Sequence, residues 1–133
     1  MRVLADTHAL LWWRGEPARL SPTALRELER ADPVLLSPIS IWEMSTLLRL
    51  KRIRLDRGLV EWVTDLFGEG IAIAELTPRA ASDAGSWSPD EFPGDPADRL
   101  IYATARELRV PLVSKDEKLH SIAARRGDLR VIW

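Results

Sequence analysis

The chain of 133 residues contains no cysteine and only two histidines. Without cysteine it can form neither disulfide bonds nor thiolate metal sites. No segment reaches the roughly 18 consecutive apolar residues that a membrane-spanning helix needs. The N-terminus also lacks the basic start, long apolar core and small-residue cleavage site of a secretory signal peptide. These absences predict a cytoplasmic protein with no membrane segment.

The chain also has little excess charge of either sign. Its 19 basic and 20 acidic residues give a formal net charge of -1. This balance does not by itself indicate a nucleic-acid-binding protein, although the distribution of charge matters more than the sum. Of the 19 basic residues, 16 are arginine, which suits bidentate phosphate or carboxylate contacts. A GC-rich coding sequence would produce the same excess of arginine.

Short apolar runs alternate with helical segments along the whole chain, and its length is typical of one domain, spanning 1–133. Strands are expected at 2–5, 34–36, 71–73, 110–113 and 129–133. Helices are expected at 7–13, 22–31, 38–50, 57–67, 78–85, 96–108 and 116–126, with Asp56 as the cap of the helix at 57–67. This alternation predicts an α/β fold, a three-layer α/β/α sandwich around a mostly parallel five-stranded sheet.

Acidic residues stand where predicted strands and helices meet. Asp6 follows the first strand, Asp116 follows the fourth, and Asp98 lies in the helix that leads into the fourth. Ligands of open α/β sheets bind beyond the carboxyl ends of the strands, so these acids are expected at one edge. Taken singly, each is more simply a helix cap, and Asp95 with Asp98 resembles a capping box.

Glu43 is the most informative single residue, because it lies four residues from both Ile39 and Leu47 on a helical apolar stripe. A carboxylate there is costly to bury unless something compensates it. The alternative places Glu43 at the rim of the stripe, paired with an arginine. Together with the three aspartates it suits a hard cation such as Mg²⁺ or Mn²⁺, which prefers carboxylate and water oxygens. Such a site would hydrolyse phosphodiesters with activated water.

At these residues the chain resembles the PIN-domain family, and within it the VapC-type toxins of bacterial toxin–antitoxin systems. The matching segments occur in the family's order and spacing along the whole chain: Leu4-Ala5-Asp6-Thr7-His8-Ala9-Leu10-Leu11-Trp12, Ser37-Pro38-Ile39-Ser40-Ile41-Trp42-Glu43-Met44, Asp95-Pro96-Ala97-Asp98-Arg99-Leu100-Ile101-Tyr102-Ala103-Thr104-Ala105 and Leu112-Val113-Ser114-Lys115-Asp116. The resemblance implies a compact PIN-like α/β/α fold and a Mg²⁺-dependent endoribonuclease, with Mn²⁺ as a possible substitute. It also implies an RNA substrate, a cognate antitoxin and a homodimer.

The resemblance assigns roles residue by residue. It implies catalytic roles for four acids, of which the three aspartates hold metal: Asp6, Glu43, Asp98 and Asp116. Supporting positions near the metal are Thr7, Ser114, Asp95 and Arg99, and the last is expected to contact phosphate or pair with Asp95. The related branch often has a histidine where this chain has Pro93, so any role of that histidine is absent or moved.

Several other basic and aromatic residues allow more than one interpretation. The run of Arg49, Lys51, Arg52, Arg54 and Arg57 could follow an RNA backbone or meet an acidic antitoxin, but solvated cations at a helix end are the simpler interpretation. Four helical tryptophans are expected to pack in the core or against a partner: Trp12, Trp13, Trp42 and Trp62. Candidates for a partner surface are Trp12, Trp13 and Trp62. Trp87 is expected to pack rather than stack on a base, and His8 and His120 are expected to be surface or packing residues.

Two other functions compete with the nuclease. A non-catalytic PIN-like module would bind RNA or protein, which the presence of all four acids disfavours. A phosphoryl-transfer protein is the third possibility. A haloacid-dehalogenase-like phosphatase needs Asp-x-Asp-x-Thr after the first strand, where this chain has Asp6-Thr7-His8-Ala9-Leu10. A receiver domain needs a late lysine, which Lys115 supplies, but also an early acidic pair that is missing.

Overall fold

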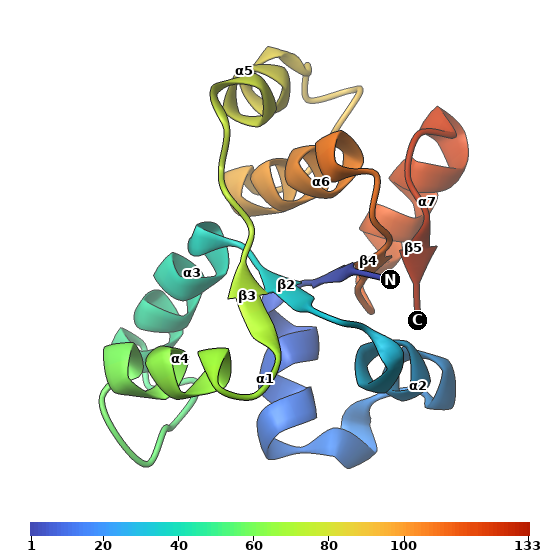
Figure 1. Ribbon diagram of the computed structural model, residues 1–133. Helices are drawn as coiled ribbons and strands as arrows, with labels where there is room; N and C mark the ends of the chain where they lie inside the picture. The colour runs from blue at the N-terminus through green and yellow to red at the C-terminus, as the bar shows by residue number, and fades with distance from the viewer.

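The computed structural model describes all residues, 1–133, and is built around a central sheet (Figure 1). The sheet contains β1 (Val3–Ala5), β2 (Val34–Leu36), β3 (Ile71–Ile73), β4 (Leu112–Val113) and β5 (Val131–Ile132), in the order β3-β2-β1-β4-β5. Every neighbouring pair is parallel. The predicted α/β fold is therefore confirmed, and the sheet is wholly rather than mostly parallel.

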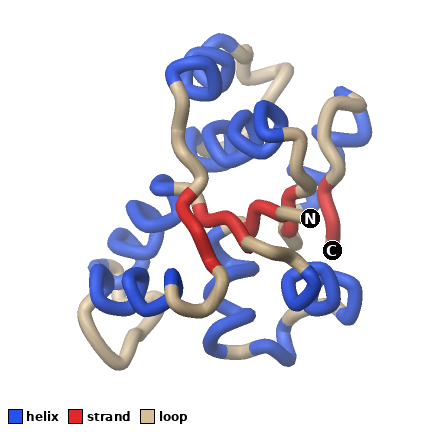
Figure 2. Tube along the Cα trace, in the orientation of Figure 1, coloured by secondary structure: helices blue, strands red, loops and turns tan.

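Helices cover both faces of the sheet (Figures 1 and 2). One layer consists of α1 (Thr7–Gly15), α2 (Pro22–Arg30), α3 (Pro38–Arg49) and α4 (Leu59–Phe67), and the other of α5 (Pro78–Ser86), α6 (Pro96–Leu108) and α7 (Glu117–Arg126). Alternate strand residues face alternate layers, so Leu4 packs with the α5–α7 core while Val3 and Ala5 pack with the other. None of the helices is both long and apolar enough to span a bilayer.

Capping residues set where most helices begin. The side chains of Asp6, Ser21, Ser37, Thr77, Asp95 and Asp116 each accept a hydrogen bond from a backbone amide in the first turn of the following helix. The prediction for α4 was wrong, because Asp56 does not cap it. The helix begins at Leu59 after Gly58, which supplies no side-chain cap, and Asp56 instead pairs with Arg57.

The two last strands are shorter than predicted, and one short helix was missed. Val110 is not in β4, because its amide donates to the carbonyl of Ala105 and completes the end of α6. Pro111 has no amide proton to add to the ladder. A 3₁₀ turn, Pro17–Arg19, was not predicted; it joins α1 to α2.

The tryptophans divide between core and surface. Trp62 is only 8% exposed and belongs to the α1–α4 core, so its prediction as part of a partner surface is wrong. Trp12 and Trp13 are half-buried at the edge of that core. Trp42 is 63% exposed instead of packed. Trp87 stacks on Phe92 with ring centroids 5.3 Å apart, as expected of a packing residue.

Candidate active site

The strands end together at one edge of the sheet, and the predicted acids gather there. Ala5 is in register with Leu36 of β2 and Val113 of β4, so the loops after these three strands leave side by side. A pocket of about 760 Å³ opens at this edge. Its lining includes all four predicted acids together with Thr7: Asp6, Glu43, Asp98 and Asp116. Three other predicted positions, Asp95, Ser114 and Arg99, stand outside the lining.

Asp6 lies at the centre of this edge, between β1 and α1. Its backbone amide donates to the Val113 carbonyl at 3.0 Å, and its Oδ1 accepts from the Ala9 amide at 2.9 Å. Burial raises the pKa of the Asp6 carboxyl, although hydrogen bonds from the Ser114 hydroxyl and the Ala9 amide act in the opposite direction. Asp6 thus caps α1 through Oδ1 while its side chain also lines the pocket.

Glu43 enters the pocket from α3 and is held by a hydroxyl rather than by an arginine. The Thr7 hydroxyl oxygen lies 2.6 Å from Glu43 Oε1 and 2.9 Å from Ser40 Oγ. A hydroxyl has one proton, so Thr7 donating to Glu43 requires that it accept from Ser40. Burial raises the pKa of Glu43, and the negative charges of Asp95 and Asp6 add to the effect.

The pKa of Asp98 is raised far above its ordinary value. Burial, followed by the charges of Asp95 and Asp116, raises its pKa to about 7. Asp95 itself is exposed and caps α6, accepting from the Ala97 amide at 2.8 Å. Gly94 has φ +114°, a conformation that favours glycine, and a Cβ built there would lie 3.9 Å from Asp98 Oδ2. The chain therefore turns tightly beside this carboxylate.

Asp116 closes the pocket from the loop after β4. Its backbone amide donates to Ser114 Oγ at 3.1 Å, and its Oδ1 caps α7 through the Lys118 amide at 2.9 Å. His120 lies in the next turn, with Nε2 2.7 Å from the Ser114 carbonyl oxygen. This contact gives His120 a packing role, in agreement with the sequence interpretation. Ser114, which does not line the pocket, thus forms hydrogen bonds with Asp6, Asp116 and His120.

No basic side chain forms an ion pair with any of the acids in or beside the pocket. As the side chains stand, no three His, Asp or Glu residues are grouped closely enough to hold a metal ion. The set of donors nevertheless fits a hard divalent cation. Its carboxylates and the Thr7 hydroxyl offer the oxygen ligands that such a cation prefers, and the pKa values of Asp6, Glu43 and Asp98 are raised first by burial and then by the charges of neighbouring acids.

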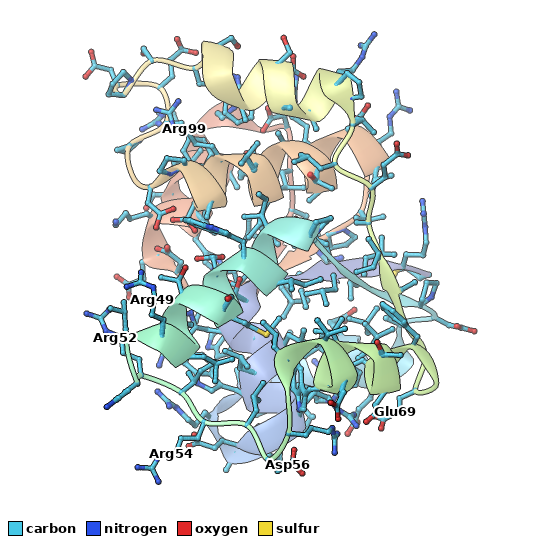
Figure 3. The ribbon with its side chains drawn as sticks, turned by 90° about the vertical axis from the view of Figure 1, so that its left-hand side faces the viewer. Arg49, Arg52, Arg54, Asp56, Glu69 and Arg99 are labelled. Atoms are coloured by element: carbon cyan, nitrogen blue, oxygen red, sulfur yellow. The ribbon has the colours of Figure 1, made fainter.

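Arg99 does not take the place predicted for it. Its guanidinium donates to the carbonyls of Trp87 at 2.5 Å and Phe92 at 2.6 Å, and at longer distance to those of Ala84 and Ser88. In Figure 3 it lies beneath the loop that joins α5 to α6. It therefore neither reaches the pocket nor pairs with Asp95. The planar guanidinium instead holds in place the loop that leads into α6, the helix that Asp95 caps and that carries Asp98.

Some pocket residues escaped the sequence reasoning. Ser40, which hydrogen-bonds to Thr7, lies one helical turn before Glu43 on the same face, and that spacing of three was the available signal. The pocket is also lined by side chains that the motifs did not single out: His8, Trp12, Arg19, Lys115, Glu117 and Trp133. Arg19 and Trp133 come from the missed 3₁₀ turn and the C-terminus, and nothing local in the sequence connects them with Asp6.

The match with known proteins agrees with this geometry. A sequence model of the PIN domain matches residues 3–125. The chain belongs to the PIN-domain family. Ribonuclease VapC22 of Mycobacterium tuberculosis (strain ATCC 25618 / H37Rv) is 43% identical to this PIN-domain chain over 119 residues, which cover 90% of either protein. The resemblance to VapC-type proteins is thereby confirmed.

Solved structures share the fold at low sequence identity. One is VapBC2 from Rickettsia felis bound to a promoter DNA fragment, with a TM-score of 0.68, 14% identity, and coverage of 98% of this chain and 97% of that one. Another is VapBC-1 from nontypeable Haemophilus influenzae, with a TM-score of 0.63, 16% identity, and coverage of 98% and 96%. At these identities the likeness shows that the PIN-like fold is shared.

Proposed function

We propose that this PIN-domain protein is a metal-dependent endoribonuclease and the toxin of a VapBC-like toxin–antitoxin pair. The observation that carries the proposal is the set of four carboxylates that share one pocket without a single basic partner. Their positions are those the PIN resemblance picks out. Support also comes from the similarity to a protein named as a ribonuclease, and from neighbours in fold that are toxin–antitoxin complexes.

In the mechanism that we propose, Asp6, Asp98 and Asp116 hold Mg²⁺, for which Mn²⁺ can substitute. The bound cation supplies a lower pKa for water and neutralises charge on the phosphate. Thr7 fixes Glu43 by donating to Oε1, which leaves Oε2 free to accept a proton from the attacking water. Ser114 and the Ala9 amide hold Asp6 in place. Cleavage would leave a 5′-phosphate and a 3′-hydroxyl.

The wider proposal covers domain, partners and location. Residues 1–133 form one PIN-like domain, which acts as a homodimer on RNA and is inhibited by a cognate antitoxin protein. A cytoplasmic location stays a prediction from the sequence. Growth arrest on induced expression, relieved by Asp6→Ala and by co-expression of the neighbouring small reading frame, is the expected behaviour of such a toxin.

The competing function is a non-catalytic PIN-like module that binds RNA or protein. A cleavage assay separates the two: purified protein is incubated with single-stranded RNA in Mg²⁺, in Mn²⁺ and in EDTA. Cleavage with either metal, none in EDTA, and none for Asp98→Asn would support the nuclease. Arg109→Gln, on the far edge of the sheet, is the matched control that keeps activity. Binding without cleavage in every metal would favour the module.

A further inference from the structure

A second groove, of about 900 Å³, runs away from the acid pocket. It lies between α1, α4 and the connector 50–58 that joins α3 to α4. Three of its lining residues, His8, Trp12 and Arg19, also line the acid pocket. The two cavities therefore adjoin, and a chain-like ligand that leaves the acids in this direction passes over His8, Trp12 and Arg19 to the groove.

In the connector, apolar residues that face the core alternate with basic residues that are exposed to the groove. Ile53 and Leu55 turn inward onto the α1–α4 core, so the residues between and before them are exposed: Lys51, Arg52 and Arg54. All three line the groove. Figure 3 shows Arg52 and Arg54 projecting outward from this connector, with Arg49 beside them at the end of α3.

These three cations differ from the arginines elsewhere in the groove because they have no acidic partner. Arg14 pairs with Glu69, and Arg57 pairs with Asp56 and Asp65. No carboxylate lies within ion-pair distance of Lys51, Arg52 or Arg54. The carboxylates nearby are thus already neutralised, and the groove keeps a surplus of positive charge along one wall.

The opposite flank of the acid pocket has the reverse charge. The loop that joins α5 to α6 carries exposed Asp90, Glu91 and Asp95. The guanidinium of Arg99 donates to four carbonyls and forms no ion pair with these acids. A polyanion whose phosphate sits at the acids is repelled on this side and attracted on the side of the groove.

We propose that the groove lined by Lys51, Arg52 and Arg54 binds the sugar-phosphate backbone of the substrate RNA on one side of the scissile bond. This inference rests on the proposed nuclease function and adds the path of the substrate to it. Charge complementarity favours a phosphate backbone, because each exposed cation can neutralise one phosphate and release its counterions. Arg19, which pairs with Glu16, lies where the two cavities adjoin.

Binding can be measured apart from cleavage. Fluorescence anisotropy with a labelled single-stranded RNA of mixed sequence, in EDTA, compares wild type with the triple variant K51Q/R52Q/R54Q. The control R79Q/R109Q/R130Q removes the same charge from exposed arginines at the other edge of the sheet. We expect affinity at low salt to fall by about tenfold or more in the groove variant, and the slope of log K against log salt to shrink by about 2, from about 0.7 per phosphate contact.

Cleavage kinetics give a second readout. With metal present, the groove variant should show a raised KM on a long RNA, whereas kcat/KM on a dinucleotide too short to reach the groove should stay unchanged. Equal loss of binding in both triple variants, or an unchanged salt slope in the groove variant, would overturn the proposal. So would normal RNA binding accompanied by lost affinity for a poly-glutamate peptide, which would make the groove a peptide site.

The two proposals fail in different ways. If wild type binds RNA through the groove but cleaves none with Mg²⁺ or Mn²⁺, the nuclease function fails and the groove stands. If wild type cleaves RNA and the groove variant binds and cleaves like it, the nuclease stands and the groove proposal fails. Melting curves of both triple variants confirm that the fold is intact, since all six side chains are exposed.

Discussion

Two clusters of charged side chains lie at opposite edges of the same sheet and shift the pKa values of their carboxylates in opposite directions. At the amino ends of the strands, Asp128 accepts from the Tyr102 hydroxyl at 2.6 Å and from Arg126 Nε at 3.1 Å, and lies 3.0 Å from Arg106 Nε. Burial alone would raise the pKa of Asp128, but these hydrogen bonds and charges outweigh it and hold the pKa below its usual value.

At the carboxyl ends, burial raises the pKa of Asp6, Glu43 and Asp98, and the charges of neighbouring acids add to the effect. Arginine is abundant in this chain, yet none of it is paired with these acids. One cluster therefore contributes stability, and the other is a group of acids without ion-pair partners in the protein, available to an external cation. The absence of arginine partners at one edge, when the other edge has them, indicates the functional site better than the presence of acids alone.

The largest expected effect concerns cleavage. Asp6→Asn should lower kcat/KM on RNA by about 100-fold or more, the loss that follows removal of one electrostatic partner of a transition state. Asn still caps α1, so the melting temperature should not fall. Asp128→Asn, at the opposite edge, should keep its activity per folded molecule. Full activity of Asp6→Asn would end the assignment of this site.

The second effect concerns metal and stability. Mg²⁺ or Mn²⁺ at about 100 times its dissociation constant should stabilise the native protein by about 2.7 kcal/mol, because the unfolded chain lacks the site. Differential scanning calorimetry in EDTA and in metal measures the shift. Asp98→Asn should remove most of it, whereas Asp128→Asn should show the full shift from a lower starting point. Identical melting temperatures with and without metal for wild type would count against the site.

The third effect concerns the paired cluster. Asp128→Asn should lower the free energy of unfolding by about 2 kcal/mol, since hydrogen bonds to a charged group contribute more than neutral ones. The Asp128 side chain is 24% exposed, which limits the loss. Urea denaturation checks the value. A matched substitution at the acid edge, Asp98→Asn, should cost nothing or raise stability in EDTA, because it removes a carboxylate that its neighbours repel.

The smallest effect is the pH dependence in EDTA, in which the two clusters act with opposite sign. The folded pKa of Asp98, about 7, lies above its ordinary value of 3.8, so the folded state binds the proton more tightly and stability should rise as pH falls from about 7 towards 4. The pKa of Asp128 is lowered, so its contribution is present above pH 4 and is lost as pH falls further. Asp98→Asn should reduce the rise, because Asp6 and Glu43 also have raised pKa values, and Asp128→Asn should weaken the acid-side loss. A wild-type stability that falls steadily from pH 7 downward contradicts this.

The sequence predicted the layers well because local rules and packing agree there. Three-residue apolar runs such as Val34–Leu36 have no other stable place than a buried parallel strand. Pairs such as Ser37-Pro38 marked helix starts that the structure keeps. The connector before α4 misled, because Asp56 could either cap a helix or pair with Arg57, and only the tertiary position of Asp65 on the far side of Arg57 decides between them.

The site was predictable as far as its motifs extend. Asp6, Glu43, Asp98 and Asp116 do share a pocket, as the register of parallel strands requires. The partner of Glu43 was not predictable, because Thr7 is 36 residues away in sequence and either a hydroxyl or an arginine would satisfy the same apolar stripe. The position of Arg99 was predicted wrongly for a similar reason. Every residue has a main-chain carbonyl, so the sequence does not show which carbonyls a side chain will bond in the folded protein.

The contacts of Arg99 have a consequence for how this protein can vary. Its guanidinium donates hydrogen bonds only to main-chain oxygens, three in the α5–α6 loop and one, that of Ala84, in α5, and every residue type provides such an oxygen. Exposed positions of the loop such as Pro89, Asp90 and Glu91 can therefore change their side chains without loosening the anchor. The flank of the pocket is open to evolutionary diversification, while the acids that follow it stay in place.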